Sequence, residues 1–461
     1  MKKKLLSLLL ISFVLAANAQ VPNKSIRYYK TAVPAKTTKK TESTESKAFF
    51  TNELLKFTLE DCITFAFSNN YNRESTKLTS DARKDQYKQS KKERLPDLSA
   101  SVSEALSHTK MVSPSWDGNY GINSGVVLYQ GGSITQTIKK NQLVAEQADL
   151  QTLQYDNDIT IQILQAFLTA LGNEELLKYQ KTLLEASEEQ VKQGKRRFQV
   201  GEILESDYLL LESQWATDKN NIVETTINRD NSLLALKSIL SIDPMQPLEI
   251  IYPDVNAVDM MSKLPTEEYA LEQSLATMPD MKISQYNVDI AETGLKISKA
   301  GYSPTISLNG SLGAGHISDF DDYGTQLSDR FNAQIGVSVS IPLFNRGRTK
   351  SNITQSKIAL KQAELERKQT ELTFRKTILQ EYRNVVSAES KYEASKVKEN
   401  AYSNSFQSYR AKYDSGSITT VELLQQQNNY VSAMNDYIQN KYGFMLKRKI
   451  LDVYMGEKIT M

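Results

Sequence analysis

The 461-residue chain contains one cysteine, Cys62, and two histidines, His108 and His316. A single cysteine excludes an intramolecular disulfide, and two isolated histidines give no zinc-site or catalytic-triad pattern. The sequence also lacks a Gly-rich phosphate-binding loop. We therefore predict that the protein is not an enzyme and holds no cofactor or metal, and that Cys62 is a small buried apolar side chain.

Neither sign of charge dominates, because 56 Lys and Arg residues stand beside 54 Asp and Glu residues. A nucleic-acid-binding protein usually needs a dominant basic face, so no nucleic acid is expected among the partners. Proline is scarce, with 11 residues, while Lys, Glu, Gln, Ser and Leu are abundant. This composition is typical of long solvated helices and not of a thick globular core.

Long apolar runs are missing except at the N-terminus. Residues 1–19 combine three lysines, a short apolar core and a final Ala-Asn-Ala, which predicts a secretory signal peptide that is cleaved after Ala19. Residues 20–52 have no periodicity and are expected to form a flexible lead. Because no later run reaches the ~18 apolar residues of a membrane-spanning helix, a membrane segment of this exported chain would have to be built from strands.

The rest of the chain contains a duplicated half-molecule. RLPDLSASV in the first half matches YSPTISLNG in the second, and RFQVGEILESDYLLLESQW matches KYDSGSITTVELLQQQNNY. The offset grows from about 208 to about 215 residues between these matches, which predicts a longer loop in the second copy. We expect a first repeat at 53–248, a connector at 249–265, a second repeat at 266–456 and a tail at 457–461.

Each repeat is predicted to begin with one helix, which a proline separates from a β-hairpin. The helices are expected at 57–93 and 266–300, and the hairpins at 97–129 and 305–343.

The hairpins show strict alternation of apolar residues with Ser, Asn and Gly, as in NAQIGVSVSI from Asn332 to Ile341. Period two predicts strands, and about ten residues is the length of a tilted membrane-spanning strand. A half-exposed sheet of a soluble protein is the alternative, but its wet face would normally carry Lys, Glu or Thr. We expect the segments 104–118 and 315–330 to be loops that face outside.

Very long helices follow the hairpins, at 133–200 and 348–415. The second of these segments contains neither Gly nor Pro, and apolar residues recur every seventh position at Ile358, Leu365 and Leu372. A seven-residue repeat implies left-handed supercoiling against neighbouring helices. Since the apolar seam is narrow, we expect helices that are wet on more than one side, as in the wall of a tube.

The same motifs follow one another in both repeats. They include FTLEDCITFAFSNNYN at 57–72, the prolines Pro96 and Pro304, LYQGG at 128–132 and PLFNRGR at 342–348. In this order they resemble the TolC-like outer-membrane efflux proteins. The resemblance implies an α+β membrane protein with a duplicated half-repeat. Its long coiled α-helices would form an α-barrel, and four β-strands per chain would contribute to a trimeric, twelve-stranded transmembrane β-barrel.

Oligomerisation also follows from the physics of strands in lipid. Four strands cannot close a barrel, and open strand edges are not tolerated in hydrocarbon, so membrane-spanning strands in this chain demand oligomerisation. The resemblance places the strand-to-helix turns at three glycines, Gly131, Gly132 and Gly347.

The function implied by the resemblance is a passive exit duct of a tripartite efflux or type I secretion system. The duct would lie in the outer membrane of a diderm bacterium and extend into the periplasm. Its partners would be outer-membrane lipid, a periplasmic adaptor (membrane fusion protein) and an inner-membrane RND or ABC transporter. An exported periplasmic coiled-coil adaptor or structural interaction protein is the alternative, but it would not explain alternating strands at duplicated positions.

Two Gly-centred turns are expected at the periplasmic tip of the helices and in adaptor docking. The resemblance assigns to them Gly201 with Ile203, and Gly416 with Ile418.

The aperture of the closed duct is expected at the same tip. By position, the resemblance makes Asp207, Tyr413 and Glu422 the candidates, and ordinary solvated helix surface is the alternative for each. Ile418 stands where the best-studied members often have a basic residue, and Gln425 where they often have an acidic one. We therefore do not expect an Arg-based polar lock at this tip, and we expect packing of Ile203 and Ile418 to contribute more than ion pairs.

Overall fold

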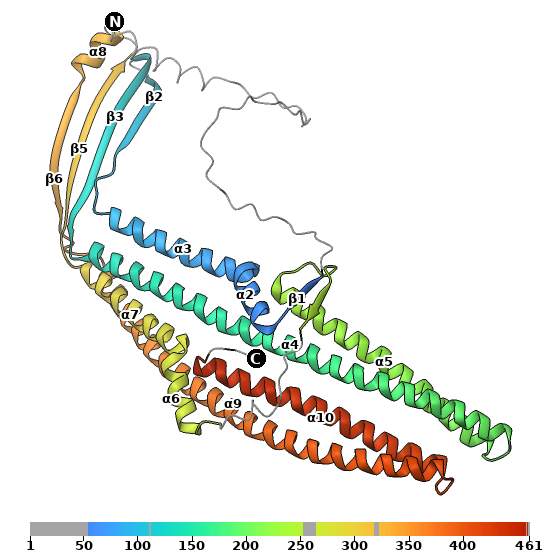
Figure 1. Ribbon diagram of the computed structural model, residues 1–461. Helices are drawn as coiled ribbons and strands as arrows, with labels where there is room; N and C mark the ends of the chain where they lie inside the picture. The colour runs from blue at the N-terminus through green and yellow to red at the C-terminus, as the bar shows by residue number, and fades with distance from the viewer. Residues whose placement is uncertain (1–53, 110–111, 252–263, 318–321, 458, 460–461) are drawn as a thin grey trace. The chain divides into compact units, whose positions relative to one another are not determined.

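The computed structural model describes residues 54–109, 112–251, 264–317, 322–457 and 459 (Figure 1). The predicted signal peptide and the flexible lead lie outside the described residues. The chain separates into a unit at Met1–Phe50 and a unit at Thr51–Met461, and all described residues belong to the second unit.

The elements of the first repeat are α2 (Leu59–Asn69), α3 (Tyr71–Lys92), β2 (Ser99–Thr109), β3 (Val112–Gln130), α4 (Ser133–Gln199) and α5 (Glu205–Leu240). Those of the second repeat are α6 (Glu267–Thr277), α7 (Pro279–Ala300), β5 (Thr305–Ile317), α8 (Tyr323–Asp329), β6 (Asn332–Ser340), α9 (Arg348–Asp414) and α10 (Thr420–Met455). Two short strands, β1 (Leu55–Phe57) and β4 (Leu248–Ile250), complete the described elements.

The two copies agree closely in the lengths of their helices. α2 and α6 each have 11 residues, α3 and α7 have 22, α4 and α9 have 67, and α5 and α10 have 36. The short helix α8 lies in the second copy only, where the growing offset predicted a longer connection. The duplicated half-repeat with very long helices is therefore confirmed.

The prediction of one unbroken helix at the start of each repeat is wrong. Asn70 separates α2 from α3 in an extended conformation, and its side-chain Oδ1 accepts a hydrogen bond from the backbone N–H of Arg73. Met278 separates α6 from α7 and precedes Pro279, whose ring disfavours a helical conformation in the residue before it. Each break lets a short helix leave the line of the longer one.

The four long strands form one antiparallel sheet in the order β2-β3-β5-β6 (Figure 1). The expected loop at 104–118 is wrong, because β2 continues to Thr109 and β3 begins at Val112. The segment 315–330 likewise contains the end of β5 and the helix α8. The amide of Gln326 in α8 pairs with the backbone of Ile317, donating at 3.0 Å and accepting at 2.7 Å, so this helix caps the strand.

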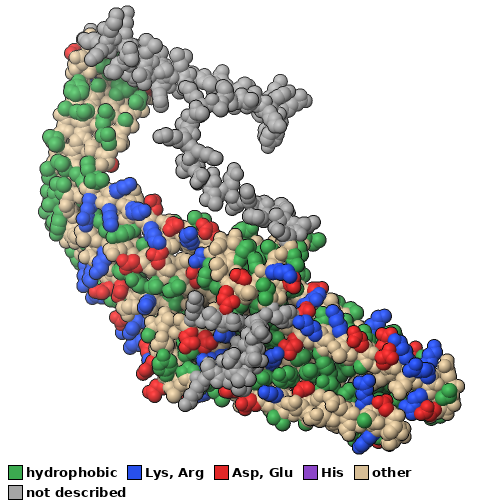
Figure 2. All heavy atoms as spheres, viewed as in Figure 1, with side chains coloured by type: hydrophobic (Ala, Val, Ile, Leu, Met, Phe, Trp, Pro, Cys, Tyr) green, Lys and Arg blue, Asp and Glu red, His purple; other side chains and the backbone are tan. Residues whose placement is uncertain are grey.

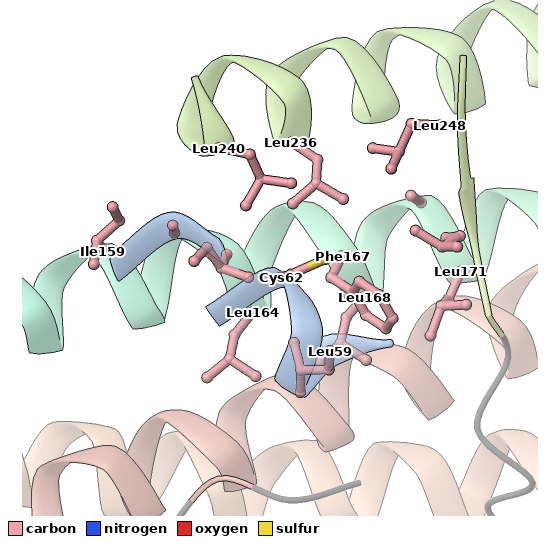
Figure 3. Packing of buried hydrophobic residues seen from close by; sticks show 14 of the residues in the cluster. Leu59, Cys62, Ile159, Leu164, Phe167, Leu168, Leu171, Leu236, Leu240 and Leu248 are labelled. Atoms are coloured by element: carbon pink, nitrogen blue, oxygen red, sulfur yellow. The ribbon is translucent and has the colours of Figure 1, made fainter. Parts of the chain in front are cut away.

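A small parallel sheet of β1 and β4 was not predicted, because three-residue strands carry little periodicity. It borders the main apolar cluster, in which α2 packs against α4 and α5. Figure 3 shows Cys62 of α2 among Phe167 and Leu168 of α4 and Leu236 and Leu240 of α5. Burial of each large apolar side chain contributes about 1.5–3 kcal/mol, so this cluster fixes α2 to the middle of α4.

The long helices pair as antiparallel hairpins, α4 with α5 and α9 with α10. α10 also packs against α4, and α7 packs against both α4 and α9. None of the helices in the described part of the chain combines the length and the apolar composition that crossing a membrane requires.

Candidate functional site: the sheet and the helical tips

One face of the four-stranded sheet is apolar and exposed. The registers place Ala100, Ile122, Leu312 and Ala333 side by side across all four strands. On the edge strand β6, Ile335 is 79% exposed although it belongs to this apolar face. Figure 2 shows hydrophobic side chains along the strands, whereas Lys, Arg, Asp and Glu gather over the helices. The exposed apolar side chains of this face suit contact with lipid, and Glu104 and His316 lie on the same face toward the β2–β3 turn.

The opposite face of the sheet is polar and hollowed. A hollow of about 570 Å³ lies over it, and its lining is dominated by Ser, Asn, Gln and Gly side chains. Asp97 also lines this hollow, and its Oδ1 accepts a hydrogen bond of 2.6 Å from the backbone N–H of Gly125. Small neutral polar side chains are the lining expected for a hydrated lumen.

The turns from strand to helix use glycine for two different reasons. Gly131 has φ +59°, and a Cβ there would meet the Cβ of Ser303 at 2.5 Å, so both its conformation and its space require glycine. Gly132 and Gly347 have φ +79° and +77°, and a Cβ at either would enter open space. These two are the N-caps of α4 and α9, so only the backbone conformation requires glycine there.

The two tip turns have the same geometry. Gly201 and Gly416 have φ +80° and +73°, and open space surrounds the position of a Cβ at each. In the first turn the N–H of Glu202 donates to the carbonyl of Arg197 at 2.8 Å. In the second turn the N–H of Ser417 donates to the carbonyl of Lys412, also at 2.8 Å. Both turns are therefore helix C-caps closed by a left-handed glycine.

The three aperture candidates have different surroundings in a single chain. Glu422 turns back to cap α10, and its carboxylate accepts from the N–H and the hydroxyl of Thr419 at 2.8 and 2.9 Å. These hydrogen bonds, first that from the backbone, lower the pKa of Glu422. Asp207 is half-buried in the first turn of α5. Within the described residues no hydrogen bond joins Asp207, Tyr413 or Glu422 to another of the three.

Tyr413 is buried in a small cluster at the second tip. Its ring packs with Phe406 and Leu423, and Ile418 lies against the same cluster. Its hydroxyl lies 3.4 Å from that of Thr420. Ile418 thus contributes apolar packing at the position where the family resemblance would place a basic residue.

Arg197 was missed by the reasoning from sequence. Its guanidinium lies 5.1 Å from the centre of the Tyr413 ring, and its Nη1 lies 3.5 Å from the Tyr413 carbonyl oxygen. Its Nη2 also forms an ion pair of 2.8 Å with Glu202. An arginine therefore does connect the two tips, but it comes from the first copy. The matched positions of Arg197 and Lys412 in the two copies were the signal that could have drawn attention to it.

No group of three or more His, Cys, Asp or Glu side chains that could hold a metal ion occurs within the described residues. The described residues do form three distinct surfaces, which are an apolar strand face, a polar strand face and the faces of the long helices.

Paired long helices joined to a sheet with one apolar and one polar face define the class of proteins that build ducts through an outer membrane. The sequence matches the outer membrane efflux protein family over residues 66–241 and 270–457, and the chain belongs to this family. It is accordingly an outer-membrane protein, and the family is one of channels and not of enzymes.

Relatives and solved structures agree with this assignment. The outer membrane protein TolC of Vibrio cholerae is 20% identical over 357 residues, covering 74% of this chain and 80% of that protein. The alkaline protease secretion protein AprF of Pseudomonas aeruginosa is 20% identical over 302 residues, covering 65% of this chain and 61% of that protein. The crystal structure of the Campylobacter jejuni CmeC outer membrane channel superposes with a TM-score of 0.74 at 18% identity and covers 94% of both chains. The predicted family and chain fold are confirmed.

Proposed function

We propose that three copies of this chain form a passive exit duct that conducts small molecules or secreted polypeptides from a periplasmic pump complex to the exterior. The observation that carries the proposal is that the sheet and the layer of helices below it have their open edges on the same two sides of the chain. The strands follow the order β2-β3-β5-β6, and the helices that continue from them pack in the order α3-α4-α7-α9. Both orders therefore end at the same two sides of the chain.

The free edges call for further copies. β2 and β6 each pair on one side only within the described sheet, and an open strand edge is not tolerated in lipid. Below them on the same side, the predicted seam residues Ile358, Leu365 and Leu372 of α9 remain exposed in the single chain. A neighbouring copy that brings its β2 to β6 and its α3 to α9 would satisfy both edges at once. Three copies would close a barrel of about twelve strands, which is wide enough for a water-filled lumen.

The proposed location in the cell follows from the signal peptide, the two faces of the sheet and the long helices. Residues 1–19 would direct export and be removed after Ala19. The apolar strand face would contact outer-membrane lipid, and the helices would extend into the periplasm. The polar strand face would line the lumen.

The tip turns are the proposed contact with the periplasmic adaptor. Near Gly201, Val200 is 77% exposed and Leu204 is 71% exposed, although both are large apolar residues. Ile203 and Ile418 lie half-buried beside them in the two turns. An apolar tip of this kind suits a protein partner. Either an RND or an ABC transporter could supply the cargo, since one relative is named for protease secretion and the family for efflux.

The test is biochemical and electrical. Detergent extraction of the outer-membrane fraction should yield a large, SDS-sensitive trimer with mixed α and β circular dichroism. The purified protein should form discrete conducting channels in planar bilayers. A monomeric, water-soluble and purely helical product would contradict the proposal.

A further inference from the structure

Polar side chains are buried together where the α4–α5 hairpin meets α10. Asp218 of α5 is 2% exposed and Gln427 of α10 is 1% exposed. The hydroxyl of Ser187 in α4 donates to the Asp218 carboxylate, and Gln214 Nε2 donates to Asp218 Oδ1 at 2.9 Å. Gln427 Nε2 lies 3.5 Å from Asp218 Oδ2. One buried carboxylate therefore joins helices of both repeats.

The duplicated sequence supplies an internal comparison. α5 and α10 have equal lengths, and the position of Asp218 in α5 corresponds to Ala433 in α10, which is fully buried. The position of Gln427 corresponds to Glu212 in α5, which is exposed. The second hairpin thus packs at this level with a methyl group, so hairpin packing alone does not require a carboxylate. Burying one costs free energy unless hydrogen bonds compensate, which indicates a role beyond filling space.

The hydrogen bonding around Asp218 is incomplete in one specific way. Gln427 Oε1 and the hydroxyl of Tyr179 in α4 are buried and have no hydrogen-bond partner within the described residues. Gln427 Oε1 is an acceptor without a donor, and it belongs to the amide that approaches Asp218. A proton on Asp218 would supply that donor after the amide rotates, because the two ends of an amide are similar in shape. Nε2 then takes the place that Oε1 leaves, so the gain lies in removing a buried charge and not in the number of hydrogen bonds.

We propose that Asp218 and Gln427 form a tie that holds α10 against the α4–α5 hairpin, and that the tie is stronger when Asp218 carries a proton. With the proton, the Asp218 hydroxyl donates to Gln427 Oε1. Without it, the contact depends on Gln427 Nε2 at 3.5 Å. The inference rests on the proposed duct function, because the tie joins the hairpins that carry Gly201 and Gly416. It therefore sets how readily the two tips separate.

The surroundings of Asp218 favour the protonated form. Burial raises the pKa of the Asp218 carboxyl, and the hydrogen bonds from Ser187 and Gln214 oppose this shift. The titratable groups that act on the neighbouring Tyr179 of α4 are Asp218 itself, Tyr430 of α10 and Glu399 of α9. The cation next to Asp218 in the sequence is Lys219, whose Nζ lies over the ring of Trp215, 5.5 Å from its centre. Since the shift is upward, Asp218 takes up its proton at a higher pH than an aspartate in solvent, and acidification strengthens the tie.

Two substitutions should each hold the protein in one state, one with the Asp218–Gln427 contact and one without it. In Asp218→Asn the new amide N–H can donate to Gln427 Oε1 at every pH, so the variant should stay tied. In Gln427→Leu both polar atoms are lost, so the variant should stay untied. Glu212→Gln is the matched control, because it changes the corresponding position of the other repeat on an exposed surface. Thermal unfolding and size-exclusion chromatography of the full-length proteins would establish that each variant folds and assembles.

The measurement is the open fraction of single channels in planar bilayers. As the pH is lowered from neutral through the range in which Asp218 takes up its proton, the wild-type open fraction should fall by roughly two- to tenfold, the factor that one hydrogen bond corresponds to. Asp218→Asn should show the low value and Gln427→Leu the high value, both without pH dependence, and Glu212→Gln should follow the wild type. A wild type without pH dependence, or an Asp218→Asn variant that keeps it, would overturn the inference.

A second readout keeps the inference separate from the duct proposal. Spin labels at Lys195→Cys and Asp414→Cys, which are exposed near the two tips, report the distance between the hairpins without any conduction. The distance should increase from the acidic to the neutral pH in the otherwise wild-type chain and stay constant with Asp218→Asn. If no variant conducts but the distance responds, the duct proposal fails and the tie stands. If the distance is the same at both pH values, the tie fails.

Discussion

The guanidinium of Arg197 lies over the ring of Tyr413, 5.1 Å from its centre, and so connects the last turn of α4 with the last turn of α9. These residues come from different repeats and lie next to the two left-handed glycines that end those helices. Arg197 is also paired with Glu202, which follows Gly201, so the first turn holds the arginine in place while the arginine covers the tyrosine. The contact resists separation of the two tips within one chain.

Removing this contact should loosen the tip. A cation–π contact of a partly buried arginine contributes about 0.5–2 kcal/mol, so Arg197→Ala should raise the open fraction or the conductance of single channels by a measurable factor. Arg196→Ala is the matched control, since Arg196 precedes Arg197 on the exposed side of the same turn. Equal conductance in Arg197→Ala, Arg196→Ala and wild type would show that the contact does not restrain the closed tip.

The acidic candidates at the tip call for a variant that removes charge and spares the helix cap. Asp207→Ala with Glu422→Ala should raise conductance or reduce cation selectivity, because acidic rings at a constriction favour cations. The Glu422 carboxylate also caps α10 through Thr419, so Glu422→Ala removes both a negative charge and a helix cap. Asp207→Asn with Glu422→Gln removes both charges and keeps an acceptor for the cap. Reversal potentials unchanged in this second pair would remove both residues from the aperture.

Sequence reasoning succeeded where a pattern extends over many residues. The long helices and the alternating strands repeat their pattern over many helical turns or residue pairs, and each pattern occurs in both repeats. It failed at single-residue decisions, such as the breaks at Asn70 and Met278 and the continuation of β2 to Thr109. A capping side chain, a following proline or a β-bulge decides these places, and none of them changes the surrounding periodicity.

The candidate site divides in the same way. The glycine turns could be predicted, because the left-handed residue that ends a helix is usually glycine and is visible in the sequence. The Arg197–Tyr413 and Asp218–Gln427 contacts could not be predicted, because each pair is separated by more than 200 residues and depends on how two hairpins dock. Only the docking of the α4–α5 hairpin against the α9–α10 hairpin brings such residues together.

Cys62 should be inert as a thiol in the folded protein. Burial among apolar side chains, and then the charges of Asp61 and Glu60, raise its pKa to about 12. The thiolate is the reactive form, and raising a thiol pKa lowers the thiolate fraction at neutral pH, so maleimide should label the native protein very slowly. Labelling in denaturant should be fast, which provides the control. Rapid labelling of the native protein would mean that α2 detaches from α4, since the thiol is otherwise covered by Phe167 and Leu236.

The tip glycines should differ from a glycine inside a helix. Gly201→Ala or Gly416→Ala places a Cβ on a left-handed residue, which costs about 1–2 kcal/mol and should displace the turn, although open space surrounds it. Gly294→Ala is the matched control, because Gly294 lies within α7, also faces open space and has no positive φ. There alanine should stabilise the helix by up to about 1 kcal/mol. Thermal unfolding should therefore show a lower melting temperature for Gly201→Ala and Gly416→Ala and a higher one for Gly294→Ala. Efflux in cells should fall only for the two tip variants. Lower stability with normal efflux in Gly201→Ala would separate the turn conformation from docking of the adaptor.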